Sequence, residues 1–195
     1  MHLPRIAAVA FFLVLGACAQ RPQPEDSFYR LIPTASQPAG LRLPQGVIQV
    51  ERFVADGLTA GRSIVFSNVG QPNLAQSYHY HFWIEPPTIL LQSALADVLR
   101  KAGAQQVVTP ELRIEPDYIV TGRIRAFEQV RGPSGFVRVQ IELALSERES
   151  GRLVMFKSYA AEPRTSGESV NEAVTQMSAA VDQIHSQFVR DIAAR

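Results

Sequence analysis

Cys18 is the residue with the most distinctive chemistry, because it is the only cysteine in the 195-residue sequence. A single thiol excludes both an internal disulfide and a thiolate metal cluster. It follows Arg5, an apolar run over residues 6–15 that is too short to cross a bilayer, and two small residues. This order is typical of a cleaved export signal, which we expect to occupy residues 1–17. The chemistry left to Cys18 is then modification at a new N-terminus.

The sequence Leu15-Gly16-Ala17-Cys18 resembles the lipobox of bacterial lipoproteins, in which the cysteine is lipidated and becomes the first residue of the mature chain. Several acyl chains, palmitate among them, would hold such a protein firmly on a membrane. Two alternatives are an ordinary signal-peptidase site with an incidental cysteine and a buried helix. Ala19 replaces the aspartate that commonly retains lipoproteins at the inner membrane. Resemblance to that sorting rule therefore favours the outer membrane, with the domain facing the periplasm.

His79 and His81 are a candidate metal-binding pair, because side chains two residues apart on a strand share a face. A zinc site needs three or four ligands, and the only other histidine after the signal is His185, in the last expected helix. Glu85 could complete a site, but nothing in the spacing requires one. An aromatic, half-exposed strand is the preferred interpretation, and we predict no metal site.

The common catalytic motifs are missing from the sequence. There is no G-x-x-x-x-G-K-[ST] phosphate loop, and Lys101 and Lys157 are the only lysines. There is no G-x-S-x-G nucleophile elbow either, since Ser134 lies in a Gly-Pro-Ser-Gly run that is better explained by a turn. The net charge of +1 also argues against a nucleic-acid partner. We therefore predict a protein without catalytic residues or cofactors.

Arg123, Arg125 and Arg138 could form a basic patch suited to lipid head groups or an acidic partner. Glu128 and Glu142 lie in the same expected strands, which favours a solvated face with cross-strand ion pairs.

Tyr80, Phe82 and Trp83 form a candidate partner surface, because aromatic residues are enriched at the centres of interfaces. Core packing explains Trp83 equally well.

These residues must be positioned by a single domain. The composition is 46% hydrophobic and 19% charged, which supports a sizeable core. We expect the lipidated cysteine and a polar tether over residues 18–27 and one domain over residues 28–195. Alternating patterns predict strands at residues 28–31, 47–54, 62–67, 78–83, 105–109, 118–130, 136–146 and 153–161, with a loop over 67–77. Spacings of three and four predict helices over 87–102, opened by Pro86 and Pro87, and from Ser169, which begins a capping box with Glu172, to about residue 192.

The last three expected strands have connections too short for a parallel crossover, so they predict an antiparallel meander. In the first of them the apolar face is expected to carry Tyr118, Val120, Ile124, Ala126 and Val130, and the other face Thr121, Arg123, Arg125 and Gln129. The predicted fold class is α+β, with a mainly antiparallel sheet packed by two helices.

Several segments resemble, in order and spacing, the ABC-type transport auxiliary lipoproteins, relatives of the paraquat-inducible-operon lipoprotein. They are Phe28-Tyr29-Arg30-Leu31 after the lipobox, Trp83 before the first helix, residues 118–128, the valine-alternating strand that follows, and the amphipathic C-terminal helix. The resemblance covers essentially the whole mature chain. It departs at residues 57–62, where the family more usually carries a tyrosine, a leucine and a proline.

The resemblance implies a non-enzymatic periplasmic component of an ABC system that moves lipids or other hydrophobic molecules between envelope membranes. Its expected partners are a permease, a cytoplasmic ATPase and a substrate-binding protein with an MCE domain, and self-association is plausible. It also implies a fold similar to the N-terminal domain of the translocation protein TolB. Two other classes stay open: a structural envelope lipoprotein that assists cell-wall synthases or outer-membrane assembly, and a hydrolase or metalloenzyme.

Overall fold

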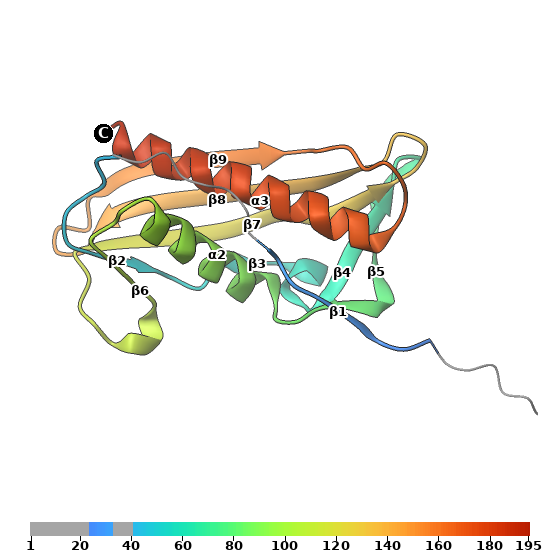
Figure 1. Ribbon diagram of the computed structural model, residues 1–195, viewed down its shortest axis with the longest axis horizontal. Helices are drawn as coiled ribbons and strands as arrows, with labels where there is room; N and C mark the ends of the chain where they lie inside the picture. Colours follow the sequence, from blue (N-terminus) through green and yellow to red (C-terminus); the bar gives the residue numbers. More distant parts are fainter. Residues whose placement is uncertain (1–23, 33–40) are drawn as a thin grey trace, which may run out of the picture.

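The computed structural model describes residues 24–32 and 41–195, and it has the α+β fold expected from the sequence. Two long helices lie on one face of a single sheet (Figure 1). The elements in chain order are β1 (Ser27–Tyr29), β2 (Val47–Val50), β3 (Val54–Ala55), the 3-10 helix η1 (Gly57–Ala60), β4 (Ser63–Asn68), β5 (Gln71–Trp83), α2 (Pro87–Lys101), β6 (Gln106–Val108), the 3-10 helix η2 (Pro110–Leu112), β7 (Tyr118–Arg131), β8 (Phe136–Glu147), β9 (Leu153–Ala161) and α3 (Val170–Ala193). Among the described residues, neither α2 nor α3 combines the length and hydrophobicity needed to span a bilayer.

Strand β7 organises the sheet. One edge of β7 pairs with β8, which pairs in turn with β9, and both pairings are antiparallel as the meander prediction required. The other edge receives β2, β3 and β4 one after another, all parallel to β7. Strand β5 then pairs antiparallel with β4, and β1 adds parallel to the end of β5. The longest ladders are antiparallel. The short parallel ladders join segments that are far apart in the sequence, so local spacing could not predict these pairings.

The region between β2 and β3 departs from the single strand expected over residues 47–54. Phe53 turns into the core, where its side chain is 1% exposed and its backbone N–H donates to the carbonyl of Thr88 in α2 at 3.3 Å. Its ring lies against Gly122 of β7 so closely that a Cβ on Gly122 would meet ring carbons at 2.6–2.7 Å. The strand breaks because the backbone must bend to bury this ring.

Strand β5 is longer than expected, and the predicted loop over residues 67–77 is wrong. Only Val69 and Gly70 form the turn after β4, and the strand resumes at Gln71. Residues 71–76 are all exposed, and Pro72 is tolerated there because no strand among the described residues pairs with the outer side of this part of β5. The polar sequence that resembled a loop is therefore an exposed edge strand.

Strand β7 carries a bulge at Arg125, between the register pairs Ile124–Ile141 and Ala126–Gln140. One extra residue reverses the alternation that follows it. Phe127 and Gln129 consequently point into the core at 1% exposure each, whereas Ala126 is only half-buried. The expected placement of Ala126 on the apolar face and Gln129 on the solvent face is wrong for this reason.

The core lies between the sheet and the two helices, and β8 and α3 supply a large part of it. Every second residue of β8 is buried, as the alternation predicts, and the list runs Val137, Val139, Ile141, Leu143 and Leu145. The facing stripe of α3 is Met177, Val181, Ile184, Phe188 and Ile192, all at most 3% exposed. Each such side chain contributes about 1.5–3 kcal/mol when it leaves water.

Both helices begin and end where the sequence predicts. Ser169 caps α3 by accepting the N–H of Glu172 at 3.2 Å, while the Glu172 carboxylate bonds to Ser166 and does not return to the cap residue. Helix α2 opens with Pro86 and Pro87, and Gln92 fixes it to the sheet by donating to the Val50 carbonyl at 2.9 Å.

Candidate docking surface

The lipobox residues Leu15, Gly16, Ala17 and Cys18 lie outside the described residues. The described chain starts at residue 24, in the expected tether, and enters the sheet at β1. The lipidation of Cys18 therefore stays a prediction, and β1 is the first structured element after it.

Aromatic side chains gather where β5 ends. The register between β4 and β5 shifts between the pairs Ser63–Phe82 and Val65–Ser77, so β5 is irregular over residues 78–81. The irregularity places His81 against two tyrosines: its Nδ1 lies 2.9 Å from the Tyr29 hydroxyl, and its ring meets that of Tyr78 edge-on at 5.3 Å. His79 instead lies exposed beside Tyr80.

The three residues of the predicted partner surface have different environments. Tyr80 is 40% exposed and Phe82 is partly exposed, so both remain available for contact. Trp83 is 1% exposed and packs on Phe127 with ring centroids 5.1 Å apart. Trp83 therefore belongs to the core, and a partner role for Tyr80 and Phe82 stays a prediction.

Strand β1 extends this aromatic region to the edge of the sheet. Phe28 is 55% exposed and stacks on Phe82 with centroids 5.8 Å apart, and the Arg62 guanidinium lies 5.4 Å from the centre of the Phe28 ring. The sequence predicted a strand at Phe28 and a family resemblance, but it did not place Phe28 on an exposed surface. Its neighbours are Phe82 of β5 and Arg62, just before β4, and the parallel pairing of β1 with β5 has no local sequence signal.

A partly buried polar cluster lies next to these aromatic residues, with the side chain of Gln129 at its buried end. The Tyr78 hydroxyl donates to Gln129 Oε1 at 2.8 Å, and Gln129 Nε2 donates to the Glu168 carbonyl at 3.2 Å. Arg131 forms an ion pair with the Glu168 carboxylate at 3.2 Å and lies over the Phe66 ring. Burial is the main reason that the pKa of Tyr78 is raised. The cluster fixes β5, β7 and the start of α3 to one another.

His185 is separated from the other histidines. It is 0% exposed within α3, where its ring meets the edge of Phe53 at 6.4 Å. Within the described part of the chain neither ring nitrogen has a hydrogen-bond partner, and burial lowers the pKa of His185 to about 3. His185 is consequently neutral near pH 7 and cannot join exposed His79 in a site. In residues 24–32 and 41–195, no three His, Cys, Asp or Glu side chains lie close enough to hold a metal ion.

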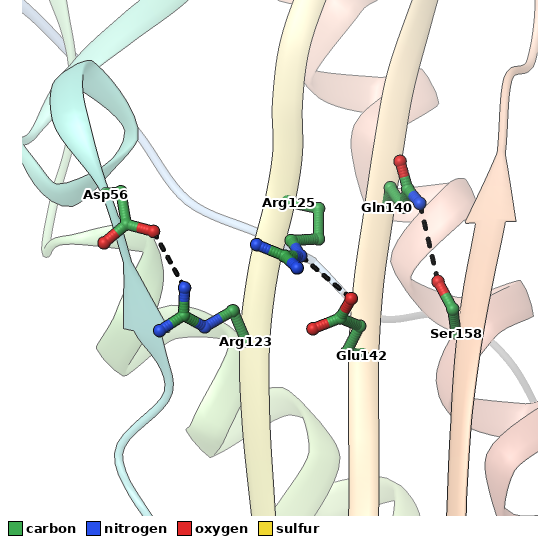
Figure 2. A network of polar contacts seen from close by, with 6 residues as sticks. All are labelled: Asp56, Arg123, Arg125, Gln140, Glu142 and Ser158. Atoms are coloured by element: carbon green, nitrogen blue, oxygen red, sulfur yellow. Dashed lines mark hydrogen bonds and ion pairs between the residues drawn. The ribbon is translucent and has the colours of Figure 1, made fainter.

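The arginines of the predicted basic patch are paired, as the alternative interpretation expected. Figure 2 shows the face of the sheet that the helices leave uncovered, where Arg123 bonds to Asp56 at 3.0 Å and Arg125 to Glu142 at 2.9 Å. Arg138 bridges Glu128 and Glu162, each at 2.9 Å. Exposed pairs of this kind contribute about 0–1 kcal/mol each. This face is a solvated network and not an unbalanced cationic surface.

Comparison with known proteins gives a family and a fold. The family model for the ABC-type transport auxiliary lipoprotein component matches residues 29–189. The crystal structure of a DUF330-family protein from Xanthomonas campestris aligns with a TM-score of 0.76 at 15% identity, covering 86% of this chain and 95% of the other.

A second crystal structure, of an uncharacterised protein, aligns with a TM-score of 0.68 at 16% identity, covering 87% of this chain and 99% of the other. The PelC dodecamer from Paraburkholderia phytofirmans aligns at a TM-score of only 0.46 and 14% identity, covering 78% and 93%, which is too weak to support an argument about assembly. No curated protein matches the chain significantly. The first two structures share the fold of this chain.

Proposed function

Because this chain belongs to the family of ABC-type transport auxiliary lipoprotein components, we propose that it is a membrane-anchored periplasmic subunit of an ABC system that carries lipids or other hydrophobic molecules. It acts as a docking module without catalysis, and its partners are an MCE-domain protein, a permease and an ATPase. The family match over residues 29–189 is the observation that carries the proposal. The lipobox ahead of the matched region supports the membrane anchor.

Exposed aromatic and apolar residues on the β4–β5 hairpin support a docking role. Tyr80 is 40% exposed, Leu74 48% and Val69 49%, and all three lie on or between strands that pair with the rest of the sheet. Rigidly held aromatic side chains make good interface anchors because little conformational entropy is lost on binding. We assign Tyr80, with Phe82 beside it, to the partner-facing surface.

A pull-down of the lipidated full chain from its native membranes in mild detergent tests the proposal. We expect MCE-domain and permease subunits with the unmodified chain, and a several-fold weaker recovery with Tyr80→Ser. Phe156→Ser is the matched control, because Phe156 is 60% exposed on the distant strand β9. Recovery of peptidoglycan synthases or outer-membrane assembly proteins would support the structural-lipoprotein alternative, and recovery of no transport subunit would count against the proposal.

A Cys18→Ala change tests the anchor separately. The tether lies between the cysteine and the domain, so the variant should keep a folded domain and appear in the soluble fraction after washing. A variant that stays membrane-bound would contradict anchoring through Cys18. Fractionation of inner and outer membranes of the unmodified strain tests the proposed outer-membrane location.

A further inference from the structure

The edge formed by β1 exposes large apolar side chains beside α3. Phe28 is 55% exposed and Ile32 is 67% exposed, and both line a groove of about 400 Å³ together with Val174 and Ala179 of α3. The Ile32 backbone N–H donates to the Ser178 hydroxyl at 3.4 Å, which holds this segment against the helix. Asn171 and Thr175 also line the groove, which is thus a mixed feature of the surface with exposed apolar side chains at its rim.

The covalent anchor proposed above limits how far this edge can lie from lipid. Phe28 follows Cys18 by ten positions, so the two Cα atoms are at most about 35 Å apart when the chain is fully extended. Chains of this length are on average much shorter than their extended limit, which gives the edge a high effective concentration at the bilayer surface. The far end of the domain is less constrained, because α3 alone is about 36 Å long.

Two arginines accompany the apolar residues at this edge. Arg30 and Arg62 are exposed, and within the described residues neither takes part in an ion pair. Arg62 donates Nε to the Trp83 carbonyl and lies over the Phe28 ring, so its stem runs beside apolar surface. Arginines placed in this way suit the boundary between acyl chains and phosphate groups. Glu25 and Asp26 precede them, so the local charge is close to balanced and the contact is chiefly apolar.

We propose that the β1 edge, defined by Phe28, Arg30, Ile32 and Arg62, inserts into the interfacial layer of the phospholipid bilayer that holds the acyl chains. The acyl chains retain the protein, and the β1 edge sets its orientation. The opposite end of the sheet, with the β8–β9 turn and the C terminus, then points away from the membrane (Figure 1). This inference rests on the proposed membrane anchor.

The experiment places a fluorescent reporter at each end of the lipidated full chain. Phe28→Trp reports on the edge, and Leu153→Trp is the matched control, since Leu153 is 58% exposed and its neighbour Val154 lines a groove with the C-terminal Arg195. Both variants also contain the buried Trp83, whose fluorescence is the same background in both. The purified proteins are reconstituted in vesicles of phosphatidylethanolamine with a minority of phosphatidylglycerol, with nitroxide-labelled lipids as quenchers.

We expect the added tryptophan of Phe28→Trp to emit at shorter wavelength and to be quenched more by a shallow acyl nitroxide than by one near the chain end, because interfacial residues sit about 5–10 Å into the boundary. The added tryptophan of Leu153→Trp should show neither effect. Ile32→Trp provides a second edge reporter if Phe28→Trp fails to fold by circular dichroism. Vesicle-bound protein with no quenching at either edge position, or equal quenching at Leu153, overturns the inference and leaves the proposed function standing. Protein that does not float with the vesicles overturns the anchor and the inference together.

Discussion

The sheet face under α3 and the β1 edge both carry apolar side chains, but only the first is closed. Phe188 of α3 is 0% exposed and meets Tyr159 edge-on at 6.1 Å, inside a core that extends along the meander. Phe28 of β1 makes an aromatic contact of similar length with Phe82 and remains 55% exposed. Two ring contacts of similar length therefore occur at very different exposures. The two pairs differ in how much of their surface is removed from water. Because Phe28 remains 55% exposed, its pair with Phe82 can contact something outside the chain.

Truncation of the two phenylalanines gives the largest predicted difference. Phe188→Ala should lower the free energy of unfolding by about 3–5 kcal/mol, because it removes a fully buried ring and leaves a cavity. Phe28→Ala should change it by less than about 0.5 kcal/mol, as exposed substitutions usually do. Denaturant unfolding monitored by Trp83 fluorescence measures both. A comparable loss from Phe28→Ala would mean that the edge is part of the core and would weaken the membrane-contact inference.

The sheet face under α3, which we call the closed region, is also the part of the fold that the sequence predicts well. Strands β8 and β9 and helices α2 and α3 follow from periodicity, since each has one buried and one solvated face, and the Ser169 cap follows from the Ser-x-x-Glu pattern. The bulge at Arg125 was missed, although one signal was present: the large apolar residues Ile124 and Phe127 are three apart, which breaks a period of two. A search for such breaks would have moved Gln129 into the core.

The β1 edge together with β4 and β5, which we call the open region, could not be predicted to the same extent. Its shape comes from parallel pairing of β1 with β5 and of β4 with β7, between segments tens of residues apart. Residues 71–76 lack a buried face altogether, so alternation could not identify them as a strand. The aromatic run that contains Tyr80 is visible in the sequence, whereas the groove beside Phe28 depends on α3 and is not.

Gly122 tests how tightly the closed region is packed. Gly122→Ala should destabilise the domain by about 2–3 kcal/mol, because the new Cβ would meet the fully buried Phe53 ring at 2.6–2.7 Å. Thermal unfolding of the single variant and of the double variant with Phe53→Leu measures the effect. Because leucine is smaller than phenylalanine, the double variant should be less destabilised than the sum of the two separate substitutions. Purely additive losses of stability would contradict the steric explanation.

His185 should make the closed region sensitive to acid. Burial lowers its pKa to about 3 in the folded protein, whereas an unfolded histidine titrates near 6.5. The unfolded chain therefore takes up the proton first, so the stabilisation is fully present above about pH 6.5 and is lost as pH falls toward 3. Between pH 7 and pH 5 we expect a loss of about 2 kcal/mol at 1.36 kcal/mol per unit.

Chemical denaturation of the unmodified protein and of His185→Leu at both pH values measures this slope. The carboxyl groups of Asp191, Glu147 and Glu172 have pKa values lowered from already acidic ones, so they keep their charge throughout this range. The pH dependence should therefore be much flatter in His185→Leu. An equal slope in both proteins would assign the acid sensitivity to other groups.

Tyr78 lies at the boundary between the two regions and gives the smallest predicted effect. Tyr78→Phe keeps the ring against Phe66 and His81 but removes the hydroxyl that donates to Gln129, whose side chain is 1% exposed. A buried amide oxygen without its donor costs about 1 kcal/mol, and Tyr80→Phe at the exposed position should cost almost nothing. If the open region is held in place by this cluster, hydrogen exchange of β5 amides should also accelerate in Tyr78→Phe but not in Tyr80→Phe. Unchanged hydrogen exchange together with unchanged stability would mean that the aromatic contacts alone hold β5 in place. The boundary between the closed core and the open edge would then lie within β5.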